Sequence, residues 1–312
     1  MRKNRILALI LTLVMVISLT ACGSSKTSRI DPLMWIVKDG EGGCLYLMGT
    51  IHVGDERMEN LPLKVTKTMD ACDYLAVEFD ILETENNTAG LLETMKSLMY
   101  TDGTTIKDHI DGEIYEDAKK IMEDSGIYNS ALDYYVPIMW QQFVSEAFMQ
   151  KTDLKTEYGA DRALIEYANE KNIEVLDIES MELQMDMLKS LSPETQEYLL
   201  GASVLTSKDM YNKSLNAMYE SWVDGDREKL ETLVAADSGL TESVMNDEAK
   251  AAMDEYNEKM LTIRNQNMAL AAERYIDGGA TVLLAVGTAH MFGDDGIISL
   301  LESKGYTVEE WQ

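Results

Sequence analysis

Short apolar runs rich in Val, Leu and Tyr lie near both ends of the chain, and one more lies near residue 175. Such runs indicate buried β-strands when Gly, Pro, Asn or Asp residues bound them. The expected strands cover residues 34–37, 44–48, 74–80, 173–178, 281–286 and 306–309. Because these strands must pair to bury their apolar faces, the two ends of the chain are expected to meet in one sheet.

The middle of the chain carries apolar residues at three- and four-residue spacing, which predicts helices. The expected helices cover residues 61–72, 91–99, 114–122, 138–149, 159–171, 181–222 with a break near Pro193, 227–236, 242–275 and 295–303. The first two strands flank a Gly-rich turn and predict a hairpin. The strand–helix–strand order of residues 44–80 predicts parallel pairing. The sequence therefore predicts an α/β (α+β) fold, with a central mixed, partly parallel sheet from both chain ends and a large helical insert.

One short motif occurs twice, at the ends of two expected strands. Gly49-Thr50-Ile51-His52 follows the run at 44–48, and Gly287-Thr288-Ala289-His290 follows the run at 281–286. A glycine at a strand end lets the backbone turn or approach a ligand closely. Ligands of open α/β sheets bind at the carboxyl ends of the strands, so both histidines are expected to face one crevice. The third histidine, His109, lies among polar neighbours and is expected to be exposed.

Two imidazoles and a carboxylate form a donor set that suits a divalent transition metal such as Mn, Co or Zn. His52 and His290 are the candidate imidazole ligands. Glu78 ends an apolar strand and needs a partner there, so it is expected to be either the third ligand or the general base. Asp55 and Asp294 follow the histidines and are expected to orient the imidazoles, with turn residues as the alternative. Activation of water by such a metal suits amide hydrolysis.

A polar cluster, Arg264-Asn265-Gln266-Asn267-Met268, interrupts the apolar pattern of the long helix expected before the second histidine motif. Asn favours helices only weakly, and departures from local propensity often mark functional sites. Arg264 is therefore a candidate for binding a substrate carboxylate or an oxyanion, with Asn265 beside it. An exposed polar helix face is the alternative interpretation. Neither His-Glu-x-x-His nor Gly-x-Ser-x-Gly occurs in the sequence.

The start of the chain predicts a signal peptide. A basic segment precedes an apolar stretch that is too short to span a membrane comfortably. Leu19-Thr20-Ala21-Cys22 resembles a bacterial lipobox, so we expect removal of residues 1–21 and lipidation of Cys22. Residues 22–32 are then a flexible tether and residues 33–312 the folded domain. This organisation predicts a lipid anchor in the cell membrane, with the domain on the extracytoplasmic side.

Charge and cysteine content restrict the partners and the covalent structure. The formal net charge of −28 repels nucleic-acid phosphates, which argues against nucleic-acid binding and favours a cation or a cationic peptide. Cys44 and Cys72 are expected to be buried free thiols. A disulfide between them is the alternative, because the expected location permits one.

Several short motifs occur in a characteristic order. They are the two Gly-Thr-x-His copies, Val77-Glu78-Phe79-Asp80, Tyr158-Gly159-Ala160-Asp161, Leu176-Asp177-Ile178-Glu179 followed by Gln184, Trp222-x-x-Gly225-Asp226, and Arg264-Asn265-x-x-Met268. Together they resemble the TraB/PrgY/GumN family, whose animal relatives are the Tiki proteases, over residues 33–311. The resemblance implies a single domain related to the erythromycin-esterase and ChaN-like folds. It also implies a metal-dependent protease with His52, Glu78 and His290 at the site and Arg264 and Asn265 nearby.

Two functions remain open at the level of sequence. The first is a membrane-tethered, metal-dependent hydrolase, most simply a peptidase that acts on a peptide or protein substrate. The second is a lipoprotein that binds and sequesters a peptide without cleaving it, which the acidic composition and the Met-rich helical insert favour. A purely structural spacer leaves the duplicated histidine motif unexplained. The sequence does not identify the substrate, the metal or the oligomeric state.

Overall fold

Strands from both ends of the chain pair into one six-stranded sheet in the computed structural model, which describes residues 30–38, 44–237 and 246–312. The strands are β1 (Met34–Lys38), β2 (Cys44–Thr50), β3 (Tyr74–Val77), β4 (Glu174–Asp177), β5 (Thr281–Gly287) and β6 (Thr307–Glu310). Their order is β4-β3-β5-β2-β1-β6. β4, β3, β5 and β2 run parallel, whereas β1 is antiparallel to β2 and β6. The predicted hairpin and the mixed sheet built from both chain ends are confirmed.

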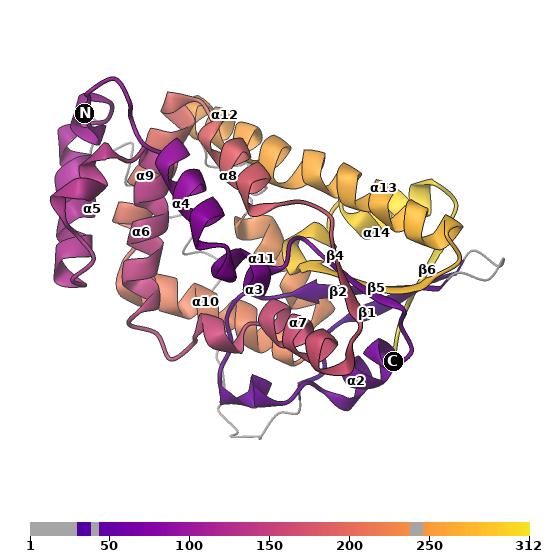
Figure 1. Ribbon diagram of the computed structural model, residues 1–312. Coiled ribbons are helices and arrows are strands. Elements are labelled where there is room, and N and C mark those ends of the chain that lie inside the picture. Colours follow the sequence, from indigo (N-terminus) through magenta and orange to yellow (C-terminus); the bar gives the residue numbers. More distant parts are fainter. Residues whose placement is uncertain (1–29, 39–43, 238–245) are drawn as a thin grey trace.

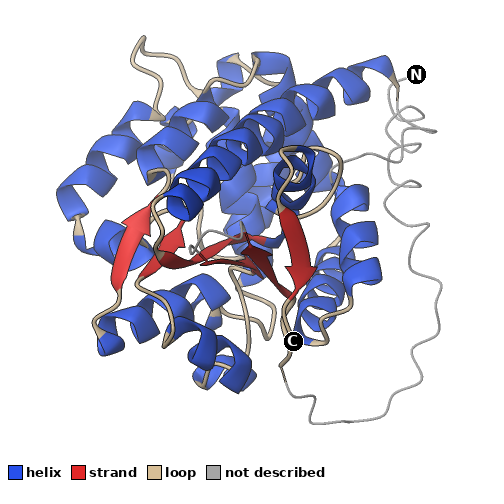
Figure 2. Ribbon diagram, turned by 90° about the vertical axis from the view of Figure 1, so that its right-hand side faces the viewer, coloured by secondary structure: helices blue, strands red, loops and turns tan. Residues whose placement is uncertain are grey.

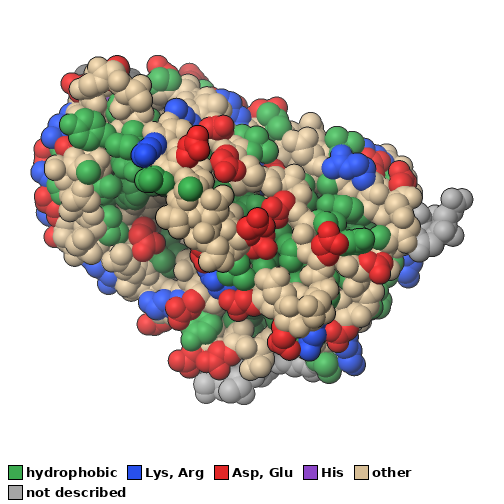
Figure 3. Space-filling view, viewed as in Figure 1, with side chains coloured by type: hydrophobic (Ala, Val, Ile, Leu, Met, Phe, Trp, Pro, Cys, Tyr) green, Lys and Arg blue, Asp and Glu red, His purple; other side chains and the backbone are tan. Residues whose placement is uncertain are grey.

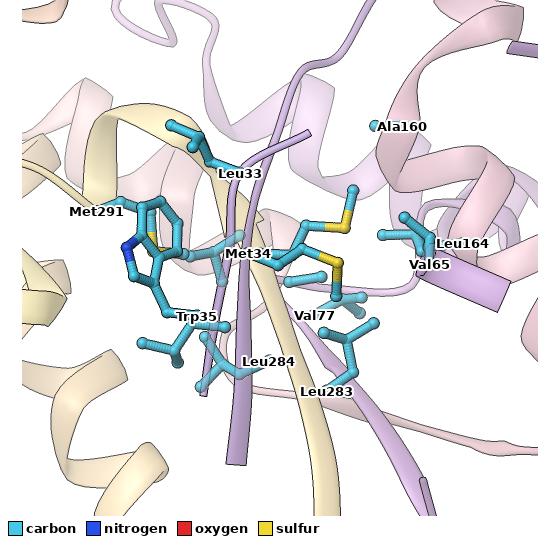
Figure 4. Packing of buried hydrophobic residues seen from close by; sticks show 14 of the residues in the cluster. Leu33, Met34, Trp35, Val65, Val77, Ala160, Leu164, Leu283, Leu284 and Met291 are labelled. Carbon is cyan, nitrogen blue, oxygen red and sulfur yellow. The ribbon is translucent and has the colours of Figure 1, made fainter. Parts of the chain in front are cut away.

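Helices cover both faces of this sheet (Figure 2). In Figure 1, α13 (Ile263–Asp277) and α14 (Ile297–Ser303) lie above the strands, and α2 (Leu63–Met69) and α7 (Ala160–Lys171) lie below. Because helices cover both faces of the sheet, the centre of β5 is an uninterrupted apolar run, and its five central residues are all buried. Figure 4 shows the core between strands and helices, where Leu283 of β5 and Val77 of β3 lie near Val65 of α2 and Leu164 of α7.

The middle of the chain forms the predicted helical insert, which lies to one side of the sheet (Figure 1). Its helices are α3 (Ile81–Asn86), α4 (Thr88–Ser97), α5 (Gly112–Asp124), α6 (Pro137–Met149), α8 (Met181–Lys189), α9 (Pro193–Leu205) and α12 (Asp247–Asn257). The next two helices, α10 (Lys208–Val223) and α11 (Arg227–Asp237), pack against the core of the sheet through Trp222 and Leu230. Two further apolar clusters hold the insert together, one around Trp140 of α6 and one around Met139 and Leu188. Met95, Met185 and Met187 pack against the latter cluster, so these methionines fill the interior of the insert.

Two elements differ from their predicted extent. The strand expected at 74–80 ends at Val77, because Asp80 instead accepts hydrogen bonds from the N–H groups of Leu82 and Glu83 and caps α3. The long helix expected up to residue 275 is divided into α12, a π-helical segment (Glu258–Thr262) and α13. Its expected start at residue 242 lies outside the described residues.

The predicted signal peptide, Cys22 and most of the tether also lie outside the described residues. In the part of the chain that the structure describes, no helix is both long and apolar enough to span a bilayer. Cys44 and Cys72 are free thiols, as expected, but both are half-buried and not fully buried. The Cys72 thiol lies 3.2 Å from the carbonyl oxygen of Thr68. The relation to the ChaN-like fold remains a prediction.

Glu255 joins α12 to the start of α9 inside the insert. Its carboxylate accepts hydrogen bonds from the backbone N–H and hydroxyl of Ser192, from the Thr195 hydroxyl at 2.6 Å and from Lys259 Nζ at 2.9 Å. Burial acts to raise the pKa of Glu255, but these hydrogen bonds outweigh it and lower the pKa to about 2.

We expect Gly49→Ala to destabilise the protein by about 1–3 kcal/mol, because a methyl group there would crowd the backbone of the neighbouring strand connection. An added Cβ would lie 2.8 Å from Thr288 Oγ1 and 3.0 Å from Thr288 Cα. Urea denaturation measures the change. Gly112→Ala is the matched control, since nothing lies within 4 Å of its Cβ position. Equal stability of the two variants would show that the contact between Gly49 and Thr288 tolerates a methyl group, contrary to the prediction.

We expect Glu255→Gln to cost about 1.5–3 kcal/mol at neutral pH, because it removes hydrogen bonds to a charged group. The pKa of Glu255 is lower in the folded state than the ordinary value of 4.5, so its contribution is fully present above pH 4.5. The contribution is lost as the pH falls from 4.5 towards 2. Denaturation at several pH values should therefore show the stability gap to wild type narrowing below pH 4.5, and a constant gap would contradict the prediction.

Candidate functional site

The two copies of the histidine motif lie side by side at the carboxyl edge of the sheet. β2 and β5 are parallel neighbours in which Gly49 pairs with Val286 and Thr50 with Gly287. The Thr288 hydroxyl donates a hydrogen bond of 2.8 Å to the Thr50 carbonyl oxygen, which ties the first motif to the second. His52 and His290 therefore leave the sheet at the same edge, as predicted from the sequence.

Glu78 reaches this edge from β3, the other neighbour of β5. Its Oε1 accepts a hydrogen bond of 2.8 Å from the Gly287 N–H and lies 3.8 Å from His290 Nε2. Its Oε2 accepts from Arg264 at 2.5 Å and from Gln184 at 2.8 Å. Burial acts to raise the pKa of Glu78, but the neighbouring imidazoles, the guanidinium and the Gly287 N–H lower it to about 2. Glu78 is therefore ionised, and its Oε1 accepts one hydrogen bond where its Oε2 accepts two.

His290 is buried and held by Asn265, a residue of the predicted polar cluster. Its Nδ1 lies 2.6 Å from Asn265 Oδ1, while Asn265 Nδ2 donates to the Asp295 carbonyl oxygen at 2.9 Å. The amide orientation is thereby fixed, so His290 Nδ1 must be the donor and Nε2 carries a lone pair. Burial lowers the pKa of His290 to about 4, which keeps the ring neutral. Its free lone pair is directed towards Glu78.

His52 is exposed, with 73% of its side chain accessible, and its partner is Asp161. Its Nδ1 lies 2.8 Å from Asp161 Oδ2, so the carboxylate accepts the Nδ1 proton. The negative charge of Asp161 raises the pKa of His52 to about 9. His52 is also close enough to Glu78 and His290 to shift their pKa values.

Two glycines allow the loop before α7 to place Asp161 beside His52. Gly54 and Lys155 exchange two backbone hydrogen bonds, and the Ala160 N–H donates to the Ile51 carbonyl oxygen. A Cβ at Gly159 would lie 2.7 Å from the His52 carbonyl oxygen, and one at Gly54 would lie 2.3 Å from a loop carbonyl oxygen. The close approach of the two loops therefore requires glycine at both positions.

The two aspartates expected to orient the imidazoles have other positions. Asp55 caps a short 3-10 helix (Glu56–Glu59) and binds Arg57 and the Tyr219 hydroxyl. Asp294 is exposed, and the partner of His290 is Asn265. Both aspartates follow their histidines closely in sequence, but the Nδ1 atoms of the two rings bond to Asp161 and Asn265 instead.

Arg264 is buried and bonded to protein groups. Its Nε donates to both oxygens of Glu179 at 3.1 and 3.0 Å, and one of its terminal nitrogens donates to Glu78. The other terminal nitrogen donates to the Met260 carbonyl oxygen at 3.2 Å, within the π-helical segment. Such segments leave carbonyl groups without their usual helical partner, and they recur at functional sites. The role of Arg264 in binding a substrate anion remains a prediction, because most of its donors already hold Glu78 and Glu179.

Three residues at this edge were given no role from the sequence alone: Asp161, Glu179 and Gln184. Each lies in a motif that resembles the family, so the motifs were the available signal. Their roles depend on contacts across more than 75 residues of chain, such as Gln184 to Glu78. Sequence spacing does not reveal such contacts.

The residues at this edge fit a metal ion in part. Among residues 30–38, 44–237 and 246–312, no group of three or more His, Cys, Asp and Glu side chains is arranged to hold a metal. However, His290 Nε2 and Glu78 Oε1 are two acceptors that lie 3.8 Å apart. Two ligands bound at about 2 Å to one ion lie roughly 3–4 Å apart, so this pair matches a shared cation.

The fold and the site define an α/β protein in which two histidines and a glutamate gather at the carboxyl edge of a mixed sheet. The chain belongs to the TraB/PrgY/gumN family, whose model matches residues 33–310. It is 24% identical over 258 residues to Uncharacterized protein YbaP of Escherichia coli (strain K12), a match that covers 82% of this chain and 87% of YbaP. YbaP of Shigella flexneri matches with the same identity and coverage. No solved structure gives a significant match.

We expect Asp161→Asn to lower the pKa of His52 from about 9 towards the ordinary 6.5, because the variant loses the negative charge that favours the imidazolium. Titration of the His52 ring protons by NMR in metal-free protein measures the shift. Asp55→Asn is the control, since Asp55 binds Arg57 and Tyr219. A larger shift of the His52 pKa in Asp55→Asn than in Asp161→Asn would show that Asp55, and not Asp161, raises this pKa.

Proposed function

We propose that the protein is a metal-dependent hydrolase that acts on peptides, with a divalent ion held by His52, His290 and Glu78. The observation that carries this proposal is the pair of facing acceptors, His290 Nε2 and Glu78 Oε1. A lone pair and a carboxylate oxygen at this separation offer two ligands to one cation. Because no three-residue group is preformed in the described part of the chain, the proposal requires that the exposed His52 ring joins this pair when the ion binds.

The charge at the site supports a divalent ion. Glu78, Glu179 and Asp161 are carboxylates, and Arg264 is the one guanidinium bonded to this group of residues in the described part of the chain. His52 carries a proton at neutral pH because its pKa is about 9, and a bound ion would replace that proton. With both imidazoles then neutral, the site has two more negative than positive charges, apart from the ion. An ion such as Mn²⁺, Co²⁺ or Zn²⁺ would balance this excess, and imidazole and carboxylate ligands suit all three.

When bound, a divalent ion lowers the pKa of a water molecule and polarises a carbonyl group. The residues of the chain would then have separate tasks. Because its pKa is held near 2, Glu78 keeps its charge and accepts protons poorly, which favours the role of ligand over that of general base. Asn265 and Asp161 hold the imidazoles with Nδ1 protonated, so that Nε2 is the nitrogen offered to the ion.

The proposed location is the extracytoplasmic face of the cell membrane, with Cys22 as the lipid-anchored residue. This part of the proposal rests on the lipobox-like segment at residues 19–22 and on the basic and apolar segments before it. An anchored enzyme of this kind would meet peptides and unfolded proteins outside the cytoplasm. Its acidic surface would favour substrates with basic side chains.

A second candidate function is peptide binding without cleavage. Leu91 and Leu92 of α4 and Leu183 of α8 are exposed although they are large and apolar. Leu183 is the neighbour in α8 of Gln184, whose Nε2 donates to Glu78. In Figure 3, hydrophobic side chains gather over the region of α4. Such a surface would bind apolar peptide side chains whether or not a reaction follows.

We expect His290→Ala and His52→Ala to abolish both metal uptake and peptide hydrolysis, because each removes one proposed ligand. The test incubates full-length protein in detergent with a peptide library and Mn²⁺, Co²⁺ or Zn²⁺, followed by mass spectrometry of the products and elemental analysis of the protein. His109→Ala is the control, since His109 stacks on Tyr100 in the insert.

Full hydrolysis by His290→Ala would reject the proposed enzyme. Intact peptides that co-elute with the wild-type protein would instead favour binding without cleavage.

A further inference from the structure

A buried guanidinium is shared between two carboxylates at the site. One terminal nitrogen of Arg264 donates to Glu78 at 2.5 Å and lies 2.9 Å from Glu179, and Nε donates to Glu179. The exposed fractions of the side chains are 7% for Arg264, 13% for Glu78 and 2% for Glu179. A single carboxylate would suffice to neutralise Arg264, so the second one needs an explanation.

The backbone holds the two carboxylates close together. The Glu179 N–H donates to the Glu78 carbonyl oxygen at 2.8 Å, where β3 and β4 end as parallel neighbours. Gln184 Nε2 then donates to Oε2 of both carboxylates, at 2.8 Å to Glu78 and 3.0 Å to Glu179. Two adjacent negative charges thus face one guanidinium and one amide, which leaves one uncompensated negative charge in a buried place.

Without Glu179, Arg264 would cancel the charge of Glu78 and present its own positive charge to any approaching cation. With Glu179 in place, the positive charge of Arg264 is balanced by a carboxylate other than Glu78. Glu78 then keeps a full negative charge, and its Oε1 remains directed towards His290 Nε2. Burial makes this balance effective, because charges in a low-dielectric surrounding are poorly screened.

We propose that Glu179 is a positioning residue that acts through Arg264: it neutralises and orients the guanidinium so that Glu78 can bind a divalent cation. This inference rests on the proposed function. Glu179 itself touches neither the cation nor the substrate. Groups that surround metal ligands typically change metal affinity by about 10–100-fold when they are mutated.

The test measures Co²⁺ binding to metal-free, full-length protein in detergent by titration calorimetry. We expect Glu179→Gln to bind Co²⁺ about 10–100-fold more weakly than wild type, because the amide keeps the shape and a hydrogen bond to Arg264 but loses the charge. Glu255→Gln is the matched control, a carboxylate of the insert with at least as many hydrogen bonds and no contact with these residues. It should bind Co²⁺ as wild type does, even though it is less stable.

Glu179→Asp keeps the negative charge but shortens the side chain. This variant can be measured even if Glu179→Gln does not fold. The aspartate retains the negative charge beside Arg264, so Co²⁺ affinity should stay within about threefold of wild type. This loss is much smaller than the loss expected for Glu179→Gln, which removes the charge. A loss of tenfold or more in folded Glu179→Asp, or wild-type affinity in folded Glu179→Gln, would overturn the role of Glu179.

These outcomes are distinct from failure of the proposed function. If wild-type protein binds Co²⁺ and His290→Ala does not, the metal site stands whatever the Glu179 variants show. If the wild type binds none of Co²⁺, Mn²⁺ and Zn²⁺, the metal site and the role of Glu179 are both overturned.

Discussion

The parallel pairing of β2 with β5 is the interaction on which the rest of the structure depends. It joins residues that are more than 230 positions apart and sets two copies of one motif in adjacent strands, with Thr50 opposite Gly287. Such a contact is expensive in chain entropy, and burial of apolar side chains on both faces of β5 offsets that cost. Once it forms, the positions of His52 and His290 at one edge follow from strand direction alone.

The two histidines nevertheless have opposite surroundings. His290 is buried, neutral and fixed through Asn265, whereas His52 is exposed and paired with the charge of Asp161. Glu78 lies beside the buried ring, and its remaining hydrogen bonds come from Gly287, Arg264 and Gln184. One half of the site is therefore rigid and already in place, and the other half is open to solvent. This asymmetry suits a site that admits its ligand from the side of His52.

Local patterns in the sequence located His52, His290 and Glu78 at one sheet edge, but not the residues that bond to them. The histidines and Glu78 were accessible from local patterns because a strand, a glycine and a polar residue follow one another within a few positions. The same local reasoning predicted that Asp55 and Asp294 orient the rings, and this prediction was wrong for Asp55, which binds Arg57 and Tyr219 instead. The residues that hold the imidazoles, Asp161 and Asn265, come from helices 109 and 25 positions away in the sequence.

The sequence by itself determined the alternation of strands and helices, the sheet built from both chain ends, and the family, because these depend on local periodicity and on short motifs. Only the tertiary structure decided strand order, the end of β3 at Val77, the π-helical segment before Arg264, and the sharing of Arg264 between Glu78 and Glu179. These features depend on contacts between segments that are distant along the chain. Packing in three dimensions determines which hydrogen bonds those segments form, and no pattern along one strand or helix records them.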